Sequence, residues 1–404
     1  MARIGSGISI AGSGCSRPSE LYQISRISAP SLLDKWVEMA RKLSLFGGLR
    51  ILFNFVVFVL PSATGRVGRA IIRAWLRKLP VKPAIWNGFA GSLMLNIPPV
   101  QLQAILPSTF DAYKEWSTSR GDDIGVDVVA DNSTRLLWVG PRGGKKVLLF
   151  FHGGGYVMPL SKAHLDWVEH IREEACNAGL QLSACILEYD LIPMHPYPRQ
   201  MLQAILALKH LLSAGYELSD IIFGGDSAGG HLSLSLLSHM HHHRPFQGRE
   251  DCHVDRHYGV RGCFLVSPLC SFSFNTPSYN QWFSVDVLGK PLVSKWGEDL
   301  VDGSPWQEEI SAGKGWGMAL DVPEQWWEGL DAADHILVTG GYEEVFSDHI
   351  QELGAILQRN STGEVDIYMA NEAHDGPLMD FAAGKPPSET TRTITRFIVS
   401  SFQQ

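Results

Sequence analysis

The sequence lacks the cysteine patterns of disulfide-stabilised small domains and of zinc sites. It contains six cysteines in 404 residues, and no two of them form a CxxC pair. This excludes a disulfide framework and a structural zinc site, and we expect reduced thiols in a reducing compartment. A basic stripe is also lacking, since the formal net charge is −8 and the pI is near 6.0. Nucleic acid is therefore excluded as an expected partner, and no metal ion is expected.

A recognisable export signal is also missing. Residues 1–26 are rich in serine and glycine, carry three arginines, and contain no acidic residue before Glu20. They have no apolar core of the kind that a secretory signal needs, so we interpret them as a polar tail in preference to a weak transit peptide. The expected location is intracellular, either cytoplasmic or associated with an internal membrane.

No uninterrupted apolar run is long enough for an ordinary transmembrane helix. The segment 43–60 comes nearest, but its dense part, Ile51 to Leu60, has ten residues and ends before Pro61. A span needs about 20 residues, and the proline is expected to stop the segment. Two interpretations stay open. We favour a buried or lid helix, and the alternative is a peripheral or monotopic membrane anchor with flanking basic residues near lipid headgroups.

Short β-rich runs begin at about residue 123, after a helical and irregular N-terminal part. Gly, Asn or Asp bounds most runs, and helical periodicity separates most of them. The runs lie at 126–130, 135–139, 147–151, 182–191, 220–224, 262–270, 335–341 and 365–371. This alternation indicates an α/β fold with a mostly parallel central sheet and helices on both faces. We therefore divide the chain into residues 1–115, with a tail, an apolar segment and cap helices, and residues 116–404, the α/β domain.

One interval interrupts this alternation. Residues 271–330 have few strand signals and many turn residues, so we expect an insertion over one end of the sheet. Six of the twelve tryptophans lie there. We interpret them first as helix core, with the wall of a hydrophobic pocket as the alternative.

A GxSxG motif follows the strand expected at 220–224. Residues 225–229 read Gly-Asp-Ser-Ala-Gly, and an apolar-periodic helix comes directly after them. A serine on a sharp strand-to-helix turn has strained backbone angles and needs small neighbours, and its hydroxyl projects above the sheet. Ser227 is therefore the predicted nucleophile, with the N-terminal end of the next helix beneath any developing oxyanion.

A serine nucleophile needs a base, and in this arrangement the order along the chain is nucleophile, acid, histidine. His374 lies just beyond the strand expected at 365–371 and before the last helical segment. The histidines at 239 and 241–243 end the helix after Ser227, and we interpret them as a solvated helix end rather than a metal site. His374 is the predicted general base.

The acid that orients His374 should follow the strand expected at 335–341. Glu343, Glu344 and Asp348 lie there, and Asp348 falls about a turn too far into the next helix. Glu343 and Glu344 are adjacent, so only one of them can face the histidine. We favour Glu344 and keep Glu343 as the alternative.

A second motif adds to this pattern. His152-Gly153-Gly154-Gly155 follows the apolar run at 147–151, about 75 residues before the motif that extends from Gly225 to Gly230. With these motifs the chain resembles the hormone-sensitive-lipase-like α/β hydrolases over about residues 120–404. It is most similar to fungal ester hydrolases, including steryl and secondary-metabolite acetylesterases.

The resemblance implies an α/β-hydrolase fold with a helical cap made by the N-terminal helices and residues 271–330. It also implies an oxyanion hole built from the amides of Gly153, Gly154 and Ala228. The family places its acid at the head of a D-P-L-x-D run, and EVFSD at 344–348 matches that run with Glu for Asp and Val for Pro. This match is the reason for preferring Glu344.

Three further roles are expected around the motifs. Tyr156 is expected to line the mouth of the pocket. His152 is expected to tie the glycine loop down through hydrogen bonds rather than act as a base. His231 stands where the family often has asparagine, and we interpret it as a packing residue or an indirect contact.

These residues predict a serine carboxylic-ester hydrolase that needs no cofactor. The expected substrate is a small-molecule hydrophobic ester. It joins a short acyl group, such as acetyl, to a bulky hydrophobic alcohol. Two alternatives stay open. The same residues could serve acyl transfer or cyclisation in a secondary-metabolite pathway, or the chain could be a catalytically idle ligand-binding relative.

Overall fold

The computed structural model describes residues 45–249, 252–282 and 285–404. The predicted polar tail at 1–26 therefore lies outside the described residues. Residues Leu43–Gln404 form one compact unit. The division into 1–115 and 116–404 stays a prediction about roles within the chain.

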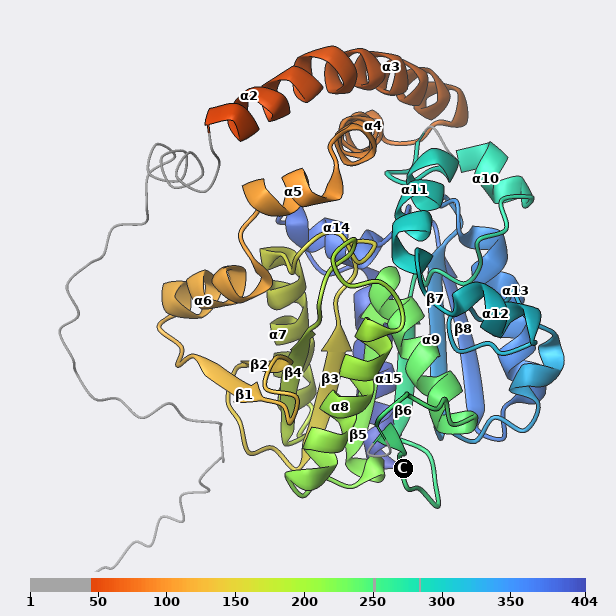
Figure 1. Ribbon diagram of the computed structural model, residues 1–404. Helices are drawn as coiled ribbons and strands as arrows, with labels where there is room; N and C mark the ends of the chain where they lie inside the picture. The colour runs from red at the N-terminus through yellow and green to blue at the C-terminus, as the bar shows by residue number, and fades with distance from the viewer. Residues whose placement is uncertain (1–44, 250–251, 283–284) are drawn as a thin grey trace, which may run out of the picture. The chain divides into compact units, whose positions relative to one another are not determined.

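An eight-stranded sheet forms the centre of the described chain (Figure 1). Its strands are β1 Gly125–Val128, β2 Arg135–Val139, β3 Lys146–Phe151, β4 Leu182–Glu188, β5 Ile221–Asp226, β6 Gly262–Val266, β7 His335–Gly341 and β8 Glu364–Ala370. The order is β1-β2-β4-β3-β5-β6-β7-β8, with β2 antiparallel to both of its neighbours and the other pairs parallel. This confirms the predicted α/β-hydrolase fold with a mostly parallel sheet.

Helices cover both faces of the sheet, because the central strands are apolar on both sides. Leu148 and Phe150 of β3 enter one core with α7 and α15, whereas Leu149 and Phe151 enter the other with α8, α9 and α13. The bounds are α7 Lys162–Asn177, α8 Arg199–Ser213, α9 Ala228–His241, α13 Ser347–Asn360, α14 Gly376–Ala382 and α15 Glu389–Gln403, with a 3₁₀ turn η2 at Leu218–Asp220. Alternate side chains of one strand thus tie the two helix layers to the same sheet.

The N-terminal helices begin with a single long helical arm. It runs without a break through α2 (Leu45–Asn54), a π-helical turn η1 (Phe55–Val59) and α3 (Leu60–Arg77). The prediction that Pro61 stops this segment is wrong. The π turn directly before α3 places the proline at the first turn of a new α-helix, where its missing N–H costs no hydrogen bond. Helices α4 (Val81–Asn96), α5 (Pro99–Ile105) and α6 (Thr109–Arg120) follow.

The favoured interpretation of segment 43–60 was a buried or lid helix, and its described residues, 45–60, are mostly not buried. Phe53 and Phe58 are 58% and 48% exposed, and only 17% of the most apolar window of helix Gly47–Arg77 is buried. By length and composition this helix could cross a membrane, and it is the one such straight helix in the part of the chain described. The lid and membrane-surface interpretations stay predictions.

The interval 271–330 is helical and irregular where the structure describes it, as an insertion should be. It contains α10 (Pro277–Trp282), α11 (Lys290–Val301), α12 (Trp306–Ser311) and a 3₁₀ turn η4 (Glu324–Trp327). Trp326 and Trp327 are buried in the core, which fits the favoured interpretation of these tryptophans.

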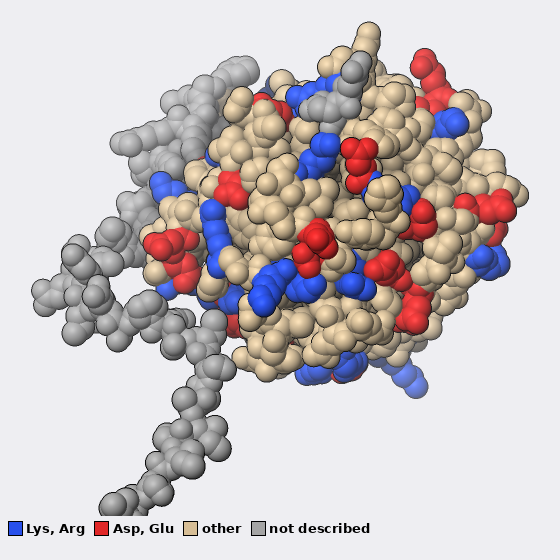
Figure 2. Space-filling model, turned by 90° about the horizontal axis from the view of Figure 1, so that it is seen from below, with Lys and Arg blue, Asp and Glu red and all other residues tan. Residues whose placement is uncertain are grey.

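On the face shown in Figure 2, Lys and Arg residues are interspersed with Asp and Glu residues.

Candidate active site

The candidate nucleophile lies on a sharp turn between β5 and α9. Ser227 has φ 51° and ψ −111°, and its amide donates to the carbonyl of Val266 at 2.8 Å. A Cβ atom on Gly229 would lie 1.9 Å from the carbonyl oxygen of Phe151. Only glycine fits there, so the turn can press against β3 and lift the serine hydroxyl above the sheet.

His374 joins the serine to a carboxylate. Its Nε2 lies 2.9 Å from Ser227 Oγ, and its Nδ1 donates to Glu344 Oε2 at 2.7 Å. All three side chains are buried. They follow the carboxyl ends of β5, β7 and β8, and parallel strands bring these ends to one edge of the sheet. The structure thus brings together the three residues predicted for catalysis.

Of the two adjacent glutamates, Glu344 is the one that faces the histidine. Its other oxygen, Oε1, accepts hydrogen bonds from the Gly341 amide at 2.6 Å and from the Ser267 hydroxyl at 2.9 Å. Glu343 is half-buried and makes no hydrogen bond to His374, and Asp348 accepts from the Ser278 amide instead. The fixed carboxylate of Glu344 can hold the ring in one orientation.

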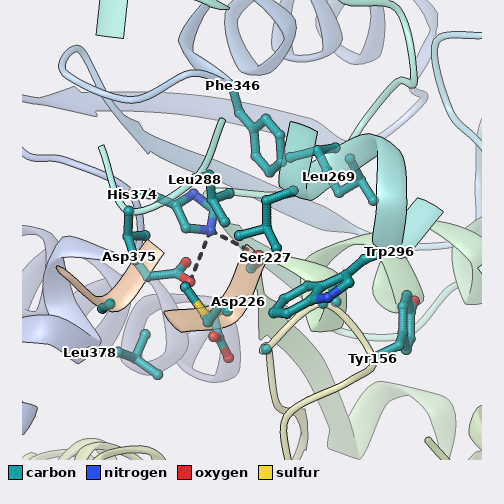
Figure 3. A pocket seen from close by; sticks show the side chains of 18 of the residues that line it. Tyr156, Asp226, Ser227, Leu269, Leu288, Trp296, Phe346, His374, Asp375 and Leu378 are labelled. Atoms are coloured by element: carbon teal, nitrogen blue, oxygen red, sulfur yellow. Dashed lines mark hydrogen bonds and ion pairs between the residues drawn. The ribbon is translucent and has the colours of Figure 1, made fainter. Parts of the chain in front are cut away.

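The electrostatics of His374 include a neighbour that the sequence did not reveal. Asp375 Oδ2 lies 3.1 Å from Nε2 of the ring, so that Nε2 faces both Ser227 and Asp375 (Figure 3). Burial lowers the pKa of His374, but the nearby charges of Asp375 and Glu344 outweigh it and raise that pKa well above the ordinary value. Burial raises the pKa of Asp375 to about 7, against the opposing effect of His374.

The glycine loop after β3 differs from the prediction at one position. The Gly153 amide donates to Asp226 Oδ1 at 2.8 Å, so it is not free to bind an oxyanion. Within the described chain, the amides of Gly154, Gly155 and Ala228 have no protein acceptor. Gly154 and Gly155 have φ 98° and 62° and line the cavity together with Ala228. At the cavity the described amides without an acceptor are therefore those of Gly154, Gly155 and Ala228, whereas the Gly153 amide is engaged.

Buried hydrogen bonds hold this loop in place. His152 Nδ1 donates to the Gly153 carbonyl at 2.8 Å, and the ring stacks on Tyr189. Burial lowers the pKa of His152 to about 3, which makes it unsuited to act as a base. It ties the loop down, as predicted.

Tyr156 and His231 connect the same loop to the insertion. The Tyr156 hydroxyl donates to His231 Nδ1 at 2.7 Å, and His231 Nε2 donates to the carbonyl of Gly317 at 2.8 Å. Tyr156 lines the cavity, but it is 2% exposed and lies in the wall rather than at the mouth. Its hydroxyl is engaged with protein, so it shapes the site through packing.

A cavity of about 270 Å³ opens above Ser227 (Figure 3). Its polar corner contains His164, Asp226, His374 and Asp375. Elsewhere its walls are mostly apolar, from α4, the segment 287–300, α14 and single loop residues: Ala90, Met94, Leu269, Phe272, Val287, Leu288, Leu292, Val293, Trp296, Leu300, Phe346, Leu378, Met379 and Ala382. Of the six tryptophans in the insertion, Trp296 lines this cavity. For that residue the alternative interpretation, the wall of a hydrophobic pocket, holds.

The N-terminal arm is fastened to the cavity wall. The buried guanidinium of Arg66 in α3 donates to the carbonyls of Asp286, Val287 and Leu288 at 3.0–3.1 Å. The Asp286 carboxylate accepts from the amide of Val345, the residue after Glu344, at 2.8 Å. One chain of hydrogen bonds therefore runs from the arm to the loop that carries the acid.

Sequence reasoning missed Asp375, Asp286 and Ser267 as parts of the site. Asp375 directly follows His374, and this adjacency was the available signal. Its side chain turns back to the ring because the residue has φ 53°, in the left-handed region that Asp tolerates better than most residues. Asp286 lies in the insertion, where no motif marks it.

The strand order, the strained serine turn and the serine–histidine–glutamate contacts define the chain as an α/β hydrolase. In agreement, a family model described as the alpha/beta hydrolase fold matches residues 148–374, and the chain belongs to this family. The match begins in β3 and ends at His374.

Relatives of the hormone-sensitive-lipase type match part of the chain. A neutral cholesterol ester hydrolase 1 from Bos taurus is 26% identical over 169 residues, which cover 40% of this chain and 38% of that protein. A carboxylesterase/phospholipase LipF from Mycobacterium tuberculosis is 27% identical over 187 residues, 45% of this chain and 44% of that one. The chain spans less than half the length of these relatives.

Solved structures share the fold over most of the chain. An esterase from the bacterial hormone-sensitive lipase family matches with a TM-score of 0.53 and 21% identity, over 85% of this chain and 98% of that one. A thermostable esterase from Pseudomonas putida matches with a TM-score of 0.57 and 17% identity, over 76% and 90%. These likenesses support the fold assignment.

Proposed function

We propose that the chain is a serine carboxylic-ester hydrolase that works through Ser227, His374 and Glu344. The observation that carries the proposal is the pair of contacts of the His374 ring, at 2.7 Å to Glu344 and 2.9 Å to Ser227, beside a cavity. These are hydrogen-bond distances for an acid, a base and a nucleophile in series. Relatives named as esterases support the same reaction.

In the proposed mechanism, His374 accepts the Ser227 proton at Nε2 while Oγ attacks the ester carbonyl. The amides of Gly154, Gly155 and Ala228 stabilise the oxyanion, and each such donor contributes about 3 kcal/mol in comparable sites. Glu344 stabilises the imidazolium. His374 then protonates the leaving alcohol, and water repeats these steps on the acyl-enzyme to release the acid.

The proposed substrate is a short acyl ester, such as an acetyl ester, of a bulky hydrophobic alcohol. Trp296 supports a short acyl group, because its indole ring packs so close to Gly155 that a Cβ atom there would lie 2.2 Å from it, and the ring limits the space beside the oxyanion loop. The apolar walls support a hydrophobic alcohol. The bovine relative is named as a hydrolase of cholesterol esters, which have such an alcohol.

A series of p-nitrophenyl esters from acetate to laurate tests both parts of this proposal. We expect kcat/KM to be highest for acetate or butyrate and to fall by about tenfold or more at laurate, because Trp296 leaves little room for a long chain beside the oxyanion loop. No turnover at any chain length would contradict the hydrolase, and a rise with chain length would contradict the short acyl group. Product analysis with an added alcohol acceptor separates hydrolysis from acyl transfer.

We also propose that segment 43–60, whose described residues 45–60 belong to the helical arm, contacts a membrane surface. Many of the exposed large apolar side chains of the described chain lie on this arm and on α4: Leu49, Leu52, Phe53, Val56, Val57, Phe58, Leu60, Ile71, Ile72, Trp75, Leu76, Ile85 and Trp86. Residues 45–110 contain seven lysines or arginines and no acidic residue. An apolar face with basic residues fits a lipid surface that carries anionic headgroups. The proposed location is the surface of an intracellular membrane.

Vesicle flotation with the full-length protein tests this contact. We expect binding to phosphatidylcholine vesicles that contain phosphatidylserine, and a loss of binding of about tenfold or more in Phe53→Glu/Phe58→Glu. The matched control is Ile124→Glu/Val128→Glu, which places the same charges on exposed apolar residues away from the arm. Equal binding by both variants, or no binding by the unmodified protein, would contradict the proposal.

A further inference from the structure

One nitrogen of the histidine ring has two oxygen neighbours. Nε2 of His374 lies 2.9 Å from Ser227 Oγ and 3.1 Å from Asp375 Oδ2. A ring nitrogen offers one lone pair or one proton. Ser227 and Asp375 therefore compete for the same position on the ring, and Figure 3 shows both contacts from that nitrogen.

The surroundings of Asp375 offer its carboxylate few partners other than the His374 ring. The side chain is 15% exposed, and its second oxygen, Oδ1, is buried without a hydrogen-bond partner in the described chain. No lysine or arginine among the described residues forms an ion pair with it. A carboxylate in such a place is stabilised mainly by the proton on His374.

The other ionisable groups around the pair are mostly acidic. His164 of α7 lies 3.3 Å from Asp226, measured from Nε2 to Oδ2, and the charge of Asp226 raises the pKa of Asp375. Glu344 faces Nδ1 of His374, and Asp286 interacts with the same ring from the insertion. These carboxylates favour retention of a proton in the cluster, whereas a protonated His164 opposes it, because His164 also interacts with Asp375.

We propose that Asp375 is a further catalytic residue, which shares Nε2 of His374 with Ser227 and holds the proton that must leave before the histidine can act as a base. The inference rests on the proposed function, because it concerns the same base.

The proton balance of this step is simple. At low pH one proton lies between Nε2 and Oδ2, either on the imidazolium beside a carboxylate or on the carboxyl beside a neutral ring. That proton is released to solvent as the pH rises, and Nε2 can then accept the Ser227 proton. Activity should therefore rise with pH along an acid limb that lies above the range of an ordinary histidine.

The kcat/KM profile for p-nitrophenyl acetate between about pH 5 and 9 tests the inference in the full-length protein. The variant is Asp375→Asn, which removes the charge, keeps the shape and tolerates the left-handed backbone. We expect its acid limb to move down by about 1 to 2 pH units, so that it is about tenfold more active than the unmodified protein on the acid side.

The matched control is Asp380→Asn on α14, which removes the same charge from a carboxylate that pairs with Lys385 instead of the histidine. Its limb should stay in place. An unchanged limb in Asp375→Asn, with Ser227 still labelled by a fluorophosphonate, would overturn the inference and leave the proposed function intact. Absence of label in the unmodified protein would instead overturn the proposed function, and the inference with it.

Discussion

Replacing Glu344 with glutamine is expected to lower kcat/KM for short acyl esters by about ten-thousand-fold. The carboxylate accepts the Nδ1 proton of His374 at 2.7 Å and is held by Gly341 and Ser267 on its other oxygen. A neutral amide cannot stabilise the imidazolium, and its NH₂ group would favour the wrong tautomer of the ring. The measurement is a comparison of initial rates at equal folded concentration.

Glu343→Gln is the matched control for this experiment. It makes the same chemical change one residue away, on a side chain that makes no hydrogen bond to His374. Its kcat/KM should stay within about threefold of the unmodified protein. A large loss in Glu343→Gln with little change in Glu344→Gln would reverse the assignment of the acid.

Ser227→Ala is expected to have the largest effect, a loss of kcat of about 10⁵- to 10⁶-fold. The change removes the attacking oxygen and leaves the oxyanion amides and the cavity in place, which accounts for the expected residual rate. The melting temperature should change little, because alanine needs only the same backbone turn and loses one hydrogen bond.

Ser233→Ala controls for the loss of a serine hydroxyl in α9, the helix that follows Ser227. Ser233 is buried in α9 and donates to the Gly229 carbonyl, but it does not contact His374. Its activity should be close to that of the unmodified protein. Retention of activity in Ser227→Ala would show that another group attacks the ester.

Much of the fold could be predicted because central strands of a parallel sheet are apolar on both faces. The runs at 147–151 and 335–341 are continuous for this reason, and their positions agree with β3 and β7 to within a residue. The positions of Ser227, His374 and Glu344 could also be predicted, because each lies within four residues of the carboxyl end of a strand.

What the sequence did not predict depends on local backbone direction. Three consecutive glycines allow several orientations of their amides, and the contact of Gly153 with Asp226 selects one of them. The helix that continues past Pro61 depends on a π turn that no residue pattern marked. Asp375 was visible as a neighbour of His374, but its contact with Nε2 depends on a left-handed residue that the sequence leaves open.

The central claim is that Ser227 is a nucleophile activated by His374. Labelling of the folded full-length protein with a fluorophosphonate, followed by mass mapping of its peptides, tests it most directly. We predict one adduct, on Ser227, that is absent in Ser227→Ala and forms far more slowly in Glu344→Gln. A folded protein that carries no adduct on Ser227, or carries it on a different serine, would contradict the account.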